Sequence, residues 1–151
     1  MKNSNIDLEN VDLGLLIKII SDDLEKMVNA ELNKIDLTLS QGGVIHFLTD
    51  KKNHQATQKE IELFLDIAHP TVTGIISRLE EKGLVKSEIT INRRLSKTVT
   101  LTQKGLELSK NADQGRIRHE QILSRGLTDS EKEKLINLLL KIKKSIDEEK
   151  K

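Results

Sequence analysis

Residues 57–102 most constrain how this chain folds, because two short helix-forming stretches are followed at once by a two-stranded pattern. The first stretch starts at Thr57 and carries Glu60 three residues later. This spacing predicts a capping box, in which the threonine hydroxyl accepts a backbone N–H and the glutamate bonds back to the first amide. Apolar side chains at helical spacing then predict a buried stripe, formed by Ile61, Phe64 and Leu65.

A second helix is predicted directly after a turn at residues 66–68. Pro70 suits the first turn of a helix, where its fixed φ and missing N–H cost little, and Gly83 suits the left-handed cap at the end. Two helices joined by a short turn, with the second free to lie in a groove of DNA, form a helix-turn-helix. The face of the second helix that packs inward carries Val72, Ile75, Ile76 and Leu79.

The outer face of this second helix carries small hydroxyl side chains and one arginine. Such side chains suit close approach to base edges and phosphates. An ordinary amphipathic surface helix is the alternative interpretation of the same pattern. We predict that the face toward the major groove consists of His69, Pro70, Thr71, Thr73, Ser77 and Arg78.

Residues 85–101 alternate between β-branched or aliphatic and polar side chains, which predicts a hairpin with one buried face that includes Val85, Ile89 and Ile91. Three cations lie between its arms, and a guanidinium can enter the narrow minor groove or pair with phosphate. A solvated polar turn is the alternative interpretation. Following a helix-turn-helix, the hairpin is typical of a wing, whose predicted DNA contacts are Arg93, Arg94, Ser96 and Lys97.

Long helices are predicted at both ends of the chain, over residues 11–34, from Thr102 to about Arg125, and after a capping box at Thr128. Their apolar faces are wide, which indicates burial against a second copy of the chain. Burial of the first helix under the chain's own last helix is the alternative. The predicted dimerisation residues are Leu13, Leu16, Ile17, Ile20, Leu138, Leu139, Ile142 and Ile146.

Residues 38–56 connect the first long helix to the helix-turn-helix. Thr38 with Gln41 predicts a further capping box, and residues 50–56 are predicted to form a polar loop. Gly42 and Gly43 lie in the first turn of the helix that follows Thr38. The sequence leaves open whether these glycines admit close packing or leave room for a ligand.

Three segments together resemble the MarR family of winged helix-turn-helix transcription regulators: TLSQ from Thr38, TQKEIELFLDIAHPTVTGIISRLEEKGLV, and NRRLSKTVTLTQKG. The combination of PTVT, RLEEKGLV and LTQKG is specific, and the similarity extends from about Leu13 to Ile146. The resemblance implies a mainly α (α+β) fold in one domain over residues 1–151. Residues 38–102 would form the winged helix-turn-helix, and residues 11–34 and 103–148 the dimerisation helices.

The resemblance also implies a homodimer that binds double-stranded DNA at a pseudo-palindromic operator, usually as a repressor released by a small ligand or an oxidant. A ligand would bind between the DNA-binding head and the dimer helices, with a lining predicted from Ile19, Met27, Ile45 and His46. Ordinary core positions are the alternative interpretation of these four residues. A winged-helix protein that acts through protein partners is the alternative function.

Some residues depart from the family pattern. Asn92, Arg93 and Arg94 stand where the family usually has an aspartate, a variable residue and an arginine, and Leu95 is one extra residue. This leaves open whether Arg93 or Arg94 enters the minor groove. Gly74 replaces a larger polar residue, and Ala68 stands where a capping serine is frequent.

Composition narrows the classes of function that the chain can have. The formal net charge is only +1, so DNA affinity has to come from local clusters of cations. The chain has no cysteine, which excludes disulfides and thiol-based sensing. The four histidines form no metal-binding motif, and no nucleophile or phosphate-loop motif appears, so we expect no metal, no cofactor and no enzyme activity. Without a signal sequence or membrane span, a cytoplasmic location is expected.

Overall fold

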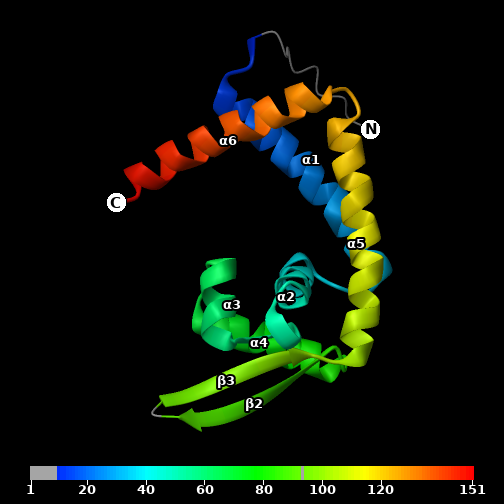
Figure 1. Cartoon of the computed structure of the whole chain (residues 1–151), viewed down its shortest axis with the longest axis vertical. Coiled ribbons are helices and arrows are strands. Elements are labelled where there is room, and N and C mark those ends of the chain that lie inside the picture. Colours follow the sequence, from blue (N-terminus) through cyan, green and yellow to red (C-terminus); the bar gives the residue numbers. More distant parts are fainter. Residues whose placement is uncertain (1–9, 93) are drawn as a thin grey trace. The chain divides into compact units, whose positions relative to one another are not determined.

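The computed structural model describes residues 10–92 and 94–151, which form helices and one small three-stranded antiparallel sheet (Figure 1). This confirms the predicted mainly α (α+β) class. The elements in chain order are α1 (Leu13–Lys34), α2 (Leu39–Thr49), a short 3-10 turn (Lys52–His54), β1 (Gln55–Thr57), α3 (Gln58–Leu65), α4 (His69–Glu81), β2 (Val85–Asn92), β3 (Arg94–Leu101), α5 (Gln103–Ser124) and α6 (Asp129–Glu149).

Contacts divide the chain into two units, one up to Arg116 and the other from Ile117 to Lys151. The first unit holds α1 to α4, the sheet and the beginning of α5. The second holds the end of α5 and all of α6. The single domain expected over residues 1–151 stays a prediction.

The core of the first unit is aliphatic, as expected for a chain with two phenylalanines and no tryptophan or tyrosine. Side chains from α2, α3, α4 and the sheet meet in it and are almost fully buried. Its fully enclosed members are Val44, Ile45, Leu48, Ile61, Val72, Ile76, Leu79 and Val99. Because α4 and the base of the hairpin share this core, their outer surfaces are held in a fixed relation.

The sheet has the order β1-β3-β2, and all its pairs are antiparallel. In β2 and β3, Val85 lies opposite Leu101 and Asn92 opposite Arg94. β1 pairs Ala56 with Val99 and corrects the prediction of a polar loop over residues 50–56. A strand of three residues is too short to show a period-two pattern in the sequence.

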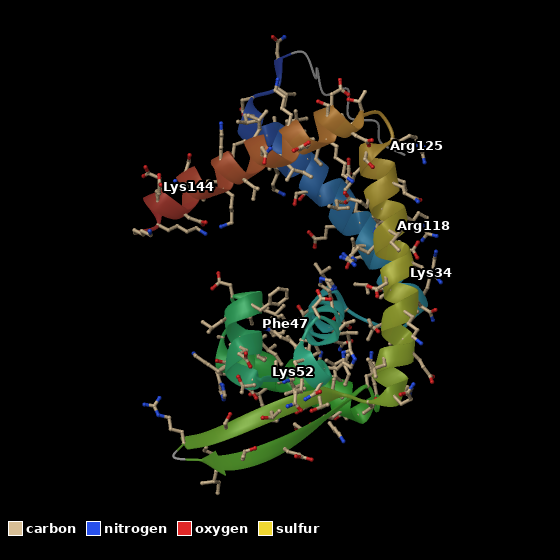
Figure 2. The ribbon with its side chains drawn as sticks, in the orientation of Figure 1. Lys34, Phe47, Lys52, Arg118, Arg125 and Lys144 are labelled. Atoms are coloured by element: carbon tan, nitrogen blue, oxygen red, sulfur yellow. The ribbon has the colours of Figure 1, made fainter. Side chains whose placement is uncertain are left out.

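Two predicted buried faces prove shorter than expected. Phe64 is 50% exposed, so it does not complete a buried stripe on α3. It stacks instead on Phe47 of α2, with ring centroids 4.4 Å apart, and Figure 2 shows Phe47 lying toward α3. Ile89 and Ile91 are 66% and 81% exposed, because the hairpin extends past the helices that bury its base (Figure 1).

The predicted helix ends hold to within two residues. The first helix begins at Leu13 instead of Val11, because Asp12 caps it by accepting the N–H of Leu15 at 2.9 Å. The three predicted capping boxes, at Thr38, Thr57 and Thr128, are all present.

Candidate nucleic-acid interface

The helix-turn-helix is built from α3, residues 66–68 and α4, as predicted. Thr57 and Glu60 close the start of α3: the Thr57 N–H donates to Glu60 Oε2 at 2.8 Å, and the Glu60 N–H donates to Thr57 Oγ1 at 3.2 Å. The first of these bonds stabilises the carboxylate and lowers the pKa of Glu60. α3 ends at Asp66, whose φ of 53° lies in the left-handed region and redirects the chain into α4.

α4 presents one apolar and one polar face. Val72, Ile76 and Leu79 have no exposed surface, which fixes the rotation of the helix about its axis. Its N-cap, Ala68, makes no side-chain bond, and Pro70 lies in the first turn. Of the residues predicted to face the major groove, Thr73 is half-buried and the others are exposed: His69, Pro70, Thr71, Ser77 and Arg78.

Polar side chains of α3 hold the first turns of α4. Gln58 and Glu62 are only 5% and 9% exposed, yet both reach toward α4. Gln58 Nε2 donates to Thr73 Oγ1 at 2.8 Å and to Glu62 Oε1 at 3.3 Å. His69 Nδ1 bonds Glu62 Oε1, and Thr73 Oγ1 donates to the His69 carbonyl at 3.0 Å. These bonds explain why Thr73 is half-buried.

The hydrogen-bond partners around His69 indicate that its Nδ1 atom carries a hydrogen. An ionised carboxylate can only accept, so Nδ1 must carry a hydrogen to bond Glu62. The two hydrogens of Gln58 Nε2 go to Thr73 and Glu62. The reversed amide would instead place an oxygen against the Glu62 carboxylate. The hydrogen bond from His69 lowers the pKa of Glu62, against the opposing effect of burial.

Gln58 and Glu62 were missed as functional candidates. With Ile61 and Leu65 they occupy positions i, i+3, i+4 and i+7 of α3, which is the face that is in fact buried or half-buried. A search for any residue type at this spacing, instead of apolar residues alone, finds this face. The sequence contains no signal for their partners on α4.

The hairpin β2–β3 forms the predicted wing. Arg94 is exposed near its tip, and Ser96 and Lys97 are half-buried. Arg93 lies outside the described residues. Because paired residues share a face of an antiparallel ladder, Arg94 and Ser96 belong to one face. Lys97 belongs to the other face, where it is paired with Ile89 of β2.

A groove of about 620 Å³ runs between the helix-turn-helix and the wing. From α3 and α4 it is lined by Gln58, Lys59, Glu62, His69 and Thr73. From the wing it is lined by Ile89, Leu95, Ser96 and Lys97. The groove therefore brings together the front of α4 and part of the wing, two sets of residues that were predicted separately.

Most of the predicted dimerisation residues are exposed in the single chain. On α1 these are Leu13, Leu16, Ile17 and Ile20, whose exposed fractions range from 36% to 60%. On α6, Leu138, Leu139 and Ile146 are exposed and Ile142 is half-buried.

The predicted ligand-lining residues differ in burial. Ile45 belongs to the core, whereas Ile19, Met27 and His46 are half-buried. Within residues 10–92 and 94–151, no group of three or more histidine, aspartate or glutamate side chains is arranged to hold a metal ion. Across that same part of the chain, no helix has the length and apolar character to cross a membrane.

Comparisons with known proteins agree with this architecture. Residues 35–92 match the sequence profile of the MarR family. The chain is similar to YwoH of Bacillus subtilis (strain 168), an uncharacterized HTH-type transcriptional regulator. The two are 31% identical over 115 residues, which cover 76% of this chain and 82% of YwoH.

Solved structures extend the similarity. The structure of Staphylococcus aureus MepR in complex with DNA has a TM-score of 0.81 and 26% identity, over 90% of this chain and 98% of MepR. The oxidised form of Escherichia coli MarR has a TM-score of 0.71 and 26% identity, over 87% of this chain and 94% of that one. The family and these neighbours are transcription regulators, not enzymes. The chain belongs to the MarR family of winged helix-turn-helix, DNA-binding transcription regulators.

Proposed function

We propose that the protein is a homodimeric repressor that binds a pseudo-palindromic operator through α4 and the wing and is released by a small ligand. The observation that carries this proposal is the exposed polar face of α4 beside a cationic wing, both held on one aliphatic core. The complex of the similar protein MepR with DNA supports it.

In this proposal α4 lies in the major groove, which is wide enough for one helix. His69, Pro70 and Thr71 approach the DNA at the start of the helix, and Thr73, Ser77 and Arg78 follow along it. A Cβ atom added at Gly74 would meet nothing within 4 Å. The backbone of α4 can therefore come close to the bases at that point.

The wing contacts the flanking DNA. Arg93 and Arg94 enter or line the minor groove, where a narrow groove concentrates negative potential. Ser96 and Lys97 contact the sugar–phosphate backbone. The exposure of Arg94 supports this assignment.

Dimerisation sets the spacing of the two heads. The exposed apolar side chains of α1 and α6 support an interface between copies, since aqueous exposure of so many aliphatic residues on two helices is unfavourable. A two-fold dimer presents its two α4 helices to successive major grooves about 34 Å apart.

Ligand release requires a ligand that binds one arrangement of the two heads better than the other. Operator affinity then changes only by that difference in binding free energy. Ile19, Met27, Ile45 and His46 are the proposed lining. The half-buried state of three of these side chains leaves them accessible to a ligand.

Fluorescence anisotropy of a labelled duplex from the region upstream of the protein's own gene tests the DNA interface. We expect selective binding in the nanomolar range with a steep salt dependence. Arg94→Ala should weaken binding about tenfold and flatten the salt slope by about one contact. Lys110→Ala, which removes an exposed cation from α5, serves as the matched control and should leave both quantities unchanged.

Weak binding to every duplex, equal in the wild type and Arg94→Ala, would contradict the proposal. The function through protein partners would then be favoured. The exposed aliphatic side chains of the wing, Ile89, Ile91 and Leu95, are the surface on which such a partner would be sought.

A further inference from the structure

Glu62 is an unusual residue for the interior of a DNA-binding head. It is 9% exposed, it lies on α3 and not on α4, and it bonds a histidine at the front of the proposed DNA interface. A buried carboxylate repels DNA phosphates and is costly to desolvate. Its position therefore calls for a role that involves its partner, His69.

The His69 ring joins the interior to the surface. Its side chain is 71% exposed although Nδ1 bonds the nearly buried Glu62. In the described part of the chain, the hydrogen bonds of this ring all involve Nδ1. Nε2, on the far side of the ring, therefore remains available at the groove between α4 and the wing.

The groove is lined by both aliphatic side chains and cations. Lys59 of α3 and Lys97 of β3 line it together with His69, whereas the lining residue from β2, Ile89, is neutral. Lys59 Nζ lies 3.5 Å from Glu62 Oε2. The charged groups that line the groove beside His69 are thus one carboxylate and two ammonium groups, and their net positive charge favours an anion such as a backbone phosphate.

We propose that Glu62 is a positioning residue for DNA binding: it holds the Nδ1–H of His69, so that a proton taken up at Nε2 makes that atom a donor to a backbone phosphate in the groove. This inference rests on the proposed DNA-binding function and goes beyond it, because it assigns His69 a phosphate contact and links operator affinity to pH.

The hydrogens on the two ring nitrogens decide whether His69 can bind a phosphate. With hydrogen on Nδ1 alone, Nε2 has a lone pair and repels a phosphate oxygen; with both nitrogens protonated, it donates to that oxygen. Because Glu62 holds the hydrogen on Nδ1, a second proton can bind only at Nε2. The lowered pKa of Glu62 keeps this carboxylate charged throughout the neutral range. Its contribution is therefore lost only in acid, as the pH falls through that lowered value.

The test measures operator affinity by anisotropy between about pH 8 and pH 6 at constant ionic strength, the range in which histidines titrate. For the wild type, Kd should fall by roughly three- to tenfold per pH unit, tenfold being the limit for one proton. His69→Gln should bind more weakly at the acid end and lose this slope. Because His69 is exposed, this variant should fold normally.

Glu62→Gln removes the negative charge of this side chain and keeps its size and its hydrogen-bond acceptor. The amide oxygen can still accept from Nδ1, but the negative charge is gone. We expect its affinity to be several-fold below the wild type at about pH 7.5 and to approach the wild type at about pH 6. Glu62→Gln combined with His69→Gln should behave as His69→Gln alone, and Glu62→Asp should recover part of the wild-type profile.

His54→Asn is the matched control. His54 lies in the 3-10 turn before β1, its Nδ1 bonds the Thr49 carbonyl at 3.0 Å, and it does not line the groove. This variant should keep the wild-type pH profile. In the free protein, nitrogen-15 spectra of the His69 ring should show hydrogen on Nδ1 in the wild type and a loss of this preference in Glu62→Gln.

Two results would overturn the inference. If the wild type binds its operator selectively and His69→Gln has the same pH slope, the phosphate contact is wrong while the proposed function stands. If the wild type binds no duplex selectively, the proposed function and this inference fail together. A ring spectrum with hydrogen mainly on Nε2 in the free wild type would independently contradict the positioning by Glu62.

Discussion

Gly105 lies where the first turn of α5 crosses the chain that leaves α4. A Cβ atom at this position would lie 2.2 Å from the Leu84 carbonyl oxygen, which belongs to the backbone and cannot turn aside. We expect Gly105→Ala to lower the free energy of unfolding by about 2–3 kcal/mol, the usual cost of overpacking or slightly more. Urea denaturation measures this change.

Gly74→Ala is the control for that prediction. It adds the same methyl group inside a helix, but there the Cβ atom meets nothing within 4 Å. Alanine favours a helix over glycine by about 1 kcal/mol, so this variant should be slightly more stable than the wild type. Equal effects of the two substitutions would contradict the steric account of Gly105.

The sequence left open whether Gly42 admits close packing or leaves room for a ligand. Its Cβ position lies 2.9 Å from Leu32 Cδ2, so the glycine admits close packing of α1 on α2. Capping boxes were predictable because donor and acceptor lie within one turn of helix. The partners of Gln58 were not, since His69 and Thr73 lie 11 and 15 residues further along the chain.

At the scale of elements, the alternation of apolar and polar residues predicted the wing but not how far it extends beyond the helices that cover its base. Period-two patterning says which residues share a face, and Val85 and Val99 do lie in the core. It does not say where the covering helices end, so Ile89 and Ile91 were wrongly expected to be buried. Alternation also does not identify β1, whose three residues pair with β3 through tertiary contacts.

Thr102 joins three of these elements. Its Oγ1 accepts the Gly105 N–H at 3.1 Å and donates to the Gly83 carbonyl at 2.6 Å, and its own N–H donates to the Leu84 carbonyl at 3.0 Å. The residue therefore caps α5 and fastens the wing base to the turn after α4, where Gly83 has a φ of 72°.

Thr102→Val keeps the shape of this side chain and removes the hydroxyl. We expect a loss of about 1–2 kcal/mol in the free energy of unfolding, as for other N-caps. Hydrogen exchange of the Gly105 amide should also become faster, because its acceptor is gone. Thr102→Ser keeps the hydroxyl and should remain within about 0.5 kcal/mol of the wild type. Equal losses in the two variants would show that the methyl group, and not the cap, is responsible.

At the scale of the whole molecule, the composition gave little guidance on partners. A net charge of +1 does not indicate a nucleic-acid-binding protein, because acidic residues on other surfaces offset the cations of α4 and the wing. The apolar faces of α1 and α6 were more informative. Their periodicity predicted which side chains lie on one face, whereas periodicity alone does not identify what covers that face.

The proposed dimer is tested by placing one charge on each face of α6. Leu139 is 44% exposed on the apolar face, and Asn137 is exposed on the opposite face at helical spacing. Leu139→Glu should convert the protein from two chains to one in sedimentation velocity at micromolar concentration, because a carboxylate would be buried in the interface. Asn137→Glu adds the same charge and should leave the dimer intact.

The single chain formed by Leu139→Glu should keep its helical circular dichroism and bind operator far more weakly, since two linked heads bind with a high effective concentration. If Leu139→Glu sediments as two chains, this face of α6 is not the dimer interface.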